Sequence, residues 1–358
     1  MRSIPAFSLL LLISVFAQGQ TSYPSAGVPT AAGGHDSPGK TQSTPVQETL
    51  SAARDKLAHG DPQQAIAMLE KLAATSPNGP GVQHELGIAY YRTGKLAAAD
   101  KAFAKAIEQD AHDMEAVQMR GLTLYRLGRQ AEAIPFLEKV KQWMPDANAD
   151  ASYVLGLCYL NTNRLEDARV AFANQFGVPP NSGAAYLLLA KMLTEVNLQE
   201  PAADATKKAL ELTPNLPLAH LMLGEYYLFK SDTDNALQQF EEERAINPGN
   251  FAVYDRLGDV YTRLGKYELA QGALAKAISL ETSSTGPFIQ MGKVLLLRND
   301  PQTALLYLEH AEKMDPGNYI THTLLAQAYR SLGRDADAKR EIDIAAKIHV
   351  AGESSPRQ

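Results

Sequence analysis

The chain has 358 residues, of which 45% are hydrophobic and 21% charged, and its formal net charge is −6. This composition is typical of soluble globular proteins and is sufficient for a large core. The mildly acidic balance, with no basic tract, argues against nucleic-acid binding as the main role.

The N-terminal residues have the layout of an export signal. Arg2 precedes an apolar run that extends from about Ile4 to Ala17 and ends in Val15-Phe16-Ala17, which has small enough residues at the two positions that matter for cleavage. We therefore expect residues 1–17 to be a cleaved signal peptide and the protein to be exported, to a bacterial periplasm or to the cell exterior. A retained membrane anchor is the alternative, but a run of about 14 residues is short for one. No cysteine lies near the cleavage site, so we do not expect a lipoprotein, nor a membrane span after cleavage.

Residues 18–45 are dominated by Pro, Gly, Ser and Thr. Such a composition offers little to bury, so we expect a disordered tether. The single cysteine, Cys158, excludes an internal disulfide. It lies in the apolar stretch YVLGLCYL, where we expect a small buried side chain rather than a nucleophile.

From Val46 to residue 352 the sequence repeats with a spacing of 34 residues, with Asn148 as one extra residue. The repeats begin at residues 46, 80, 114, 149, 183, 217, 251, 285 and 319, and residues 353–358 are expected to form a disordered tail. Position 20 is Ala in every repeat, and position 32 is Pro in six of them. Position 8 is always Gly or Ala: Ala53, Gly87, Gly121, Gly156, Ala190, Gly224, Gly258, Gly292 and Ala326.

Each repeat contains two apolar-periodic segments, which predict two helices joined by a turn at a Gly, Asn or other polar residue near position 15. Small residues at positions 8 and 20 allow the paired helices to approach, and an aromatic residue at position 11 or 24 fills the space beside them. The Pro at position 32 ends the second helix. Asp61-Pro62 and Asp300-Pro301 are expected to cap second helices. Because Ala replaces Gly at position 8 in three repeats, we expect Gly258→Ala to cost under about 1 kcal/mol.

This pattern resembles the tetratricopeptide repeat (TPR). The seventh repeat shows it well, with Tyr254, Leu257, Gly258, Tyr261 and Ala270 in the family's order. The resemblance implies an all-α fold, a right-handed α-α superhelix (TPR solenoid) of about nine helix-turn-helix repeats, with the first helix of each pair lining a concave face. The first and last repeats carry extra charge, as expected of caps.

In TPR proteins the inward-facing residues come chiefly from positions 2, 5, 9, 12 and 13. One TPR subset grips a C-terminal carboxylate with Lys and Asn there, but this chain has residues such as His84 and Ile88 instead. The fourth to sixth repeats supply an apolar floor, and the seventh supplies charge. We therefore expect a peptide-binding groove. The candidate residues are Tyr153, Leu157, Leu160, Leu187, Leu188, Leu221, Met222, Leu228, Phe229, Asp255, Arg256, Asp259 and Arg263.

Catalytic motifs are not evident. Gly258 and Gly265-Lys266 are too far apart for a phosphate-binding loop, and no histidine pair has the HExxH spacing. His220 and His322 both occupy position 4, where we expect packing. We thus predict a non-catalytic protein-binding scaffold with neither cofactor nor metal. The alternatives are a groove for a small molecule or glycan, an enzyme with an unrecognised site, homodimerisation through this surface, or an ordinary core.

Overall fold

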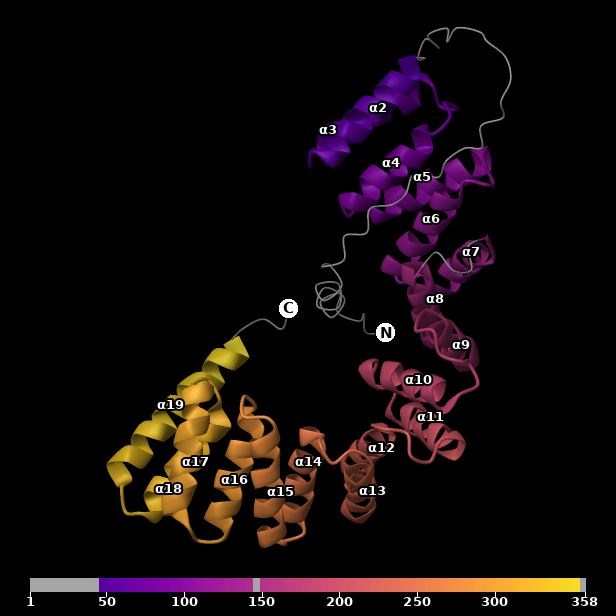
Figure 1. Ribbon diagram of the computed structural model, residues 1–358. Coiled ribbons are helices and arrows are strands. Elements are labelled where there is room, and N and C mark those ends of the chain that lie inside the picture. Colours follow the sequence, from indigo (N-terminus) through magenta and orange to yellow (C-terminus); the bar gives the residue numbers. More distant parts are fainter. Residues whose placement is uncertain (1–44, 144–148, 355–358) are drawn as a thin grey trace, which may run out of the picture. The chain divides into compact units, whose positions relative to one another are not determined.

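The computed structural model describes residues 45–143 and 149–354, and all regular secondary structure in these ranges is helical. Eighteen helices form nine helix-turn-helix pairs (Figure 1). The predicted all-α fold of paired helices is confirmed. The predicted signal peptide (1–17), the predicted tether up to residue 44 and residues 355–358 lie outside the described ranges.

The chain divides into two compact units, residues 1–180 and 181–358. In unit 1 the helices are α2 (Pro45–Ala58), α3 (Pro62–Thr75), α4 (Val82–Arg92), α5 (Leu96–Gln109), α6 (Met114–Arg126), α7 (Gln130–Trp143), α8 (Ala149–Asn161) and α9 (Leu165–Gln175). In unit 2 they are α10 (Gly183–Glu195), α11 (Gln199–Leu212), α12 (Ala219–Phe229), α13 (Thr233–Ile246), α14 (Phe251–Arg263), α15 (Tyr267–Leu280), α16 (Thr285–Leu297), α17 (Pro301–Met314), α18 (Tyr319–Ser331) and α19 (Asp335–Ser354). Helix α19 thus continues past residue 352, where the repeats were expected to end.

The turn inside every pair contains a residue with positive φ at position 15 of the repeat, between 59° and 80°. Five repeats use Gly, which adopts this conformation without steric cost, and three use Asn, which tolerates it better than most residues. The remaining repeat has Ser231. The predicted caps are also present, since Asp61 accepts a hydrogen bond from the Gln64 amide and Asp300 accepts one from the Thr303 amide. The nine turn residues are Gly60, Gly94, Gly128, Asn163, Asn197, Ser231, Gly265, Asn299 and Gly333.

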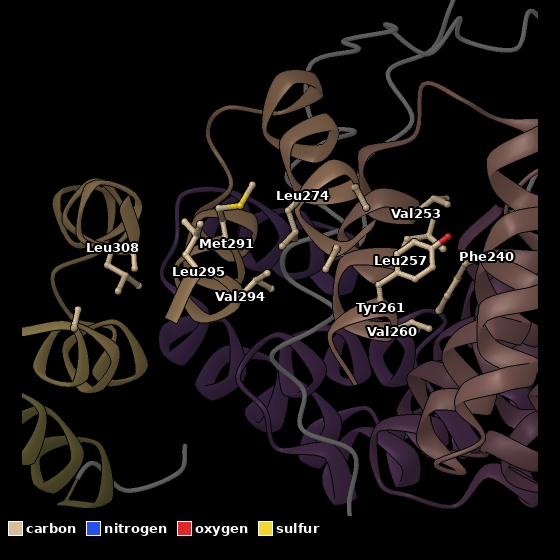
Figure 2. Packing of buried hydrophobic residues seen from close by; sticks show 14 of the residues in the cluster. Phe240, Val253, Leu257, Val260, Tyr261, Leu274, Met291, Val294, Leu295 and Leu308 are labelled. Carbon is tan, nitrogen blue, oxygen red and sulfur yellow. The ribbon is translucent and has the colours of Figure 1, made fainter. Parts of the chain in front are cut away.

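Within a pair, the glycine at position 8 lies directly against the side chain at position 24. A Cβ added to Gly224 would lie 2.4 Å from the Phe240 ring, and one added to Gly258 would lie 2.4 Å from Cδ2 of Leu274. Figure 2 shows Phe240 and Leu274 among the buried side chains of the unit 2 core. The role of glycine in close helix packing agrees with the sequence interpretation. The expectation that Gly258→Ala costs under about 1 kcal/mol did not allow for Leu274, whose side chain already occupies the space for the methyl group.

Successive pairs are joined by recurring polar contacts. The Tyr hydroxyl at position 11 donates to a Glu at position 25 of the preceding repeat, over 2.6 Å from Tyr90 to Glu70 and 2.6 Å from Tyr159 to Glu138. Burial, followed by this hydrogen bond, raises the pKa of Tyr90 to about 12. In unit 2, Tyr261 and Tyr329 donate in the same way to Glu241 and Glu309, so this contact recurs at four junctions between the described pairs.

Candidate functional site

An open cavity of about 380 Å³ lies in unit 2, lined by α10, α11, α12 and α14. It brings together predicted groove residues from the sixth and seventh repeats. These groove residues belong to different repeats, and they come close to one another only because the helix pairs stack. These residues are Met222, Leu228, Phe229, Arg256, Asp259 and Arg263.

The apolar side of the cavity belongs to α11 and α12. Met222 and Leu228 are half-buried, whereas Phe229, the last residue of α12, is 65% exposed. Ala202 and Ala203 of α11 also line the cavity, and their short side chains leave room beside α12. An exposed aromatic side chain beside a hollow is the usual form of an anchor for a bound partner.

The charged side of the cavity belongs to α14. Nε of Arg256 lies 3.0 Å from a carboxylate oxygen of Glu225, and Nη2 of Arg263 lies 2.8 Å from a carboxylate oxygen of Asp259. Both arginine side chains remain about half exposed. Nη1 of Arg256 also lies 3.6 Å from a carboxylate oxygen of Asp255. A guanidinium group has five N–H donors, so each arginine can hold these carboxylates and still donate to a ligand.

Asp255 does not line the cavity, although the sequence grouped it with the groove. Its carboxylate accepts a hydrogen bond from the Gln290 amide of α16 over 2.7 Å. Burial raises the pKa of Asp255, although the neighbouring Arg256 opposes that shift. Asp255 therefore serves the contact between α14 and α16.

Two further predictions are corrected by burial. Leu157 is 8% and Leu160 4% exposed, so both are core residues of unit 1 rather than groove residues. Their helix, α8, is apolar on nearly every side, and it is covered accordingly. Tyr153, from the same helix, is half-buried and packs against the Phe172 ring at 5.8 Å between centroids.

The remaining predicted residues lie in unit 2 but outside the cavity lining. Leu187 and Leu188 of α10 are half-buried. Leu221 of α12 is also half-buried and packs against the buried cluster shown in Figure 2. Leu221 is therefore a supporting residue of the core.

The sequence interpretation missed part of the cavity, because it drew lining residues only from the first helix of each pair. Gln199, Ala202, Ala203 and Thr206 belong to a second helix, α11. The stretch QEPAADATKKAL contains more small residues than the single Ala expected at position 20. This excess is the feature of the sequence that could have indicated an open space beside α11.

Unit 1 has a larger open cavity of about 760 Å³, lined by α2, α4, α5, α6 and the segment before α4. Two ion pairs lie among its lining residues. Nδ1 of His84 lies 2.6 Å from Asp113, and Nε of Arg54 lies 2.5 Å from Glu85. None of the predicted groove residues lines this cavity.

Cys158 is fully buried, as predicted, and burial raises the pKa of its thiol to about 12. The thiol is therefore protonated at neutral pH and is a poor nucleophile. Within residues 45–143 and 149–354, no helix combines the length and apolar character that a bilayer span needs.

Comparison with known proteins identifies the family. Two tetratricopeptide repeat models match the chain, one over residues 56–120, 124–193 and 295–350 and the other over residues 251–283. The first alone matches more than half of the chain. The chain therefore belongs to the tetratricopeptide repeat family. Members of this family are in general non-catalytic, protein-binding scaffolds.

Individual relatives are distant. Anaphase-promoting complex subunit 3 of Schizosaccharomyces pombe is 22% identical over 79% of this chain and 42% of its own length. Tetratricopeptide repeat protein 21A of Mus musculus is 22% identical over 85% of this chain and 26% of its own length. This chain thus spans less than half of either relative. The solved structure of YrrB, described as a TPR protein with an unusual peptide-binding site, aligns with a TM-score of 0.44 and 24% identity, over 51% of this chain and 93% of YrrB.

Proposed function

We propose that this scaffold binds a peptide segment of a partner protein in the unit 2 cavity between α11, α12 and α14. The observation that carries the proposal is the placement of exposed Phe229 beside two half-exposed arginines, Arg256 and Arg263, around one hollow. We infer a peptide with an apolar anchor residue followed by an acidic one. The apolar side chain contacts Phe229 and Met222, and the carboxylate accepts from the free guanidinium donors.

Peptides selected from a random displayed library with the full chain as bait provide the test. A selected peptide is synthesised, and its dissociation constant is measured by fluorescence anisotropy. Phe229→Ser and Arg256→Ser should each weaken binding tenfold or more, the loss expected for an interface anchor of about 1.4 kcal/mol.

Leu306→Ser is the matched control, because Leu306 is an equally exposed apolar residue of unit 2 (68%) that does not line the cavity. It should change the dissociation constant by less than about twofold, as surface changes outside a hot spot do. Equal losses in all three variants, or no loss in the two cavity variants, would contradict the proposal. A library that yields no binder would favour a small molecule or glycan as the ligand.

We also propose that the protein acts outside the cytoplasm. Support comes only from the sequence of residues 1–17, with its early Arg2 and its apolar run. Fractionation of the native organism and N-terminal sequencing of the purified chain test this. A mature N-terminus at about residue 18 in the periplasmic or secreted fraction supports export, whereas an intact Met1 in the cytoplasm contradicts it.

A further inference from the structure

Near the C-terminal end of unit 2, side chains from three consecutive helices meet. They are Glu312 of α17, His322 of α18 and Glu341 of α19, and one possible ligand atom from each lies within 4.8 Å of the other two. His322 is 2% and Glu341 8% exposed, whereas Glu312 is half-buried. This cluster is distant in sequence from the residues of the proposed peptide site and has no part in that proposal.

The imidazole ring of His322 is held with one nitrogen turned towards the carboxylates. Nε2 lies 3.0 Å from the carbonyl oxygen of Pro316, which can only accept, so Nε2 carries a hydrogen. Nδ1 lies 2.7 Å from Oε2 of Glu341. A histidine that donates one N–H to a backbone carbonyl and presents its other nitrogen to carboxylates has the arrangement typical of metal-ligating histidines.

The cluster contains one more carboxylate than imidazole. Two carboxylates face one imidazole, so a protonated His322 still leaves a net negative charge in a largely buried place. Among the described residues, Glu312 has no hydrogen bond or ion pair. The charged groups that act on His322 are Glu341 of α19 and Glu312 of α17.

An equivalent histidine in the sixth repeat shows which part of this arrangement the fold itself requires. Nε2 of His220 lies 3.1 Å from the carbonyl oxygen of Pro214, and its Nδ1 lies 2.8 Å from the side-chain oxygen of Gln239. The contact with a proline carbonyl is therefore a feature of the repeat. The two carboxylates, Glu312 of the eighth repeat and Glu341 of the ninth, have no counterparts around His220, because the position equivalent to Glu341 holds Gln239 and the position equivalent to Glu312 holds Leu210.

We propose that Glu312, His322 and Glu341 bind a divalent transition-metal ion, with Zn²⁺ the best fit. One imidazole nitrogen and two carboxylate oxygens are ligands that Zn²⁺ accepts in four-coordinate sites, with water in the fourth position. Bonds of about 2 Å in a tetrahedral site place ligand atoms roughly 3.3 Å apart, so only small side-chain shifts are needed. The ion takes the place of the proton between Nδ1 and Glu341. It joins α17, α18 and α19 and so fastens the terminal helix of the solenoid.

The test uses the full chain, freed of metal with a chelator and then titrated with Zn²⁺ by calorimetry and with Co²⁺ by visible absorption. We expect one Zn²⁺ per chain and the visible bands of four-coordinate Co²⁺. Glu312→Gln should weaken Zn²⁺ binding at least tenfold, since even loss of a residue that only supports a ligand costs about this much. Glu312 makes no hydrogen bond, so this variant keeps the fold, which circular dichroism verifies.

His220→Gln is the matched control and should bind Zn²⁺ as the unmodified chain does. The proposal fails if the unmodified chain shows neither binding heat nor Co²⁺ bands. It also fails if Glu312→Gln binds Zn²⁺ with unchanged affinity, because the ion is then held elsewhere on the chain.

Discussion

A single methyl group at Gly258 is the sharpest probe of how the helix pairs pack. A Cβ at this position would lie 2.4 Å from Cδ2 and 2.6 Å from Cγ of Leu274, whereas ordinary contacts measure 3.4–4 Å. Leu274 is fully buried and must therefore move by about 1 Å within a close-packed core. Overpacking of this kind costs about 1–3 kcal/mol. Replacing Gly by Ala in a helix interior otherwise stabilises the folded state by about 1 kcal/mol. We therefore expect Gly258→Ala to destabilise the chain by up to about 2 kcal/mol.

The seventh repeat contains its own control. Gly272 also lies inside a helix, α15, but it is exposed, and a Cβ there would meet nothing within 4 Å. Gly272→Ala should accordingly stabilise the chain by about 0.5–1 kcal/mol through helix propensity alone. The same substitution in the same repeat is thus expected to have opposite signs at the two positions.

Urea denaturation of the full chain, followed by far-UV circular dichroism, measures both effects. A double-mutant cycle with Leu274→Ala completes the experiment, because Gly258→Ala should cost less once the crowded Leu274 atoms are gone. If Gly258→Ala stabilised the chain as much as Gly272→Ala, close contact with Leu274 would not be the reason for the glycine.

Three further predictions concern local strain, a buried acceptor and pH. Ser231→Gly should raise the free energy of unfolding by roughly 1 kcal/mol in urea denaturation, because the turn holds Ser231 at a φ of 61°. Glu243 is fully buried, and its carboxylate accepts hydrogen bonds from two backbone amides at the start of α12. Glu243→Gln should therefore lower the thermal midpoint, at a cost of about 1–3 kcal/mol. Glu242 is exposed, so Glu242→Gln should leave the midpoint unchanged. Because burial raises the pKa of Asp255, protonation favours the folded state, and stability is lost as pH rises from the ordinary carboxyl pKa through the raised one. Asp255→Asn, which retains an acceptor for Gln290, should match the unmodified chain at low pH and exceed its thermal midpoint at neutral pH.

The features that the sequence predicted well depend on contacts within one repeat or between adjacent repeats. The spacing of 34 residues places positions 8 and 24 on facing helices of a pair, so glycine at one and a large side chain at the other indicate close packing. The Gly or Asn at position 15 and the caps at Asp61 and Asp300 act over three or four residues, and all of them are present as predicted.

The exposure of individual groove residues could not be predicted in the same way. The position in the repeat gives the side of the helix, but an apolar helix such as α8 has no polar face to mark which side stays open. Leu160 and Phe229 were both assigned to the groove, yet one is 4% and the other 65% exposed. The contribution of α11 depends on how wide a gap its alanines leave beside α12, which is a property of the packed pairs.

The central claim, that this scaffold binds its partner through the unit 2 cavity, is tested most directly by site-specific photocrosslinking. A photoreactive amino acid replaces Phe229 in one full-length variant and the equally exposed Leu306 in another. Each variant is irradiated with a peptide selected on the unmodified chain, and mass spectrometry locates the adducts. We expect an adduct at position 229 and none at position 306. An adduct at position 306 alone, or at neither position while binding persists, would place the partner elsewhere on the scaffold.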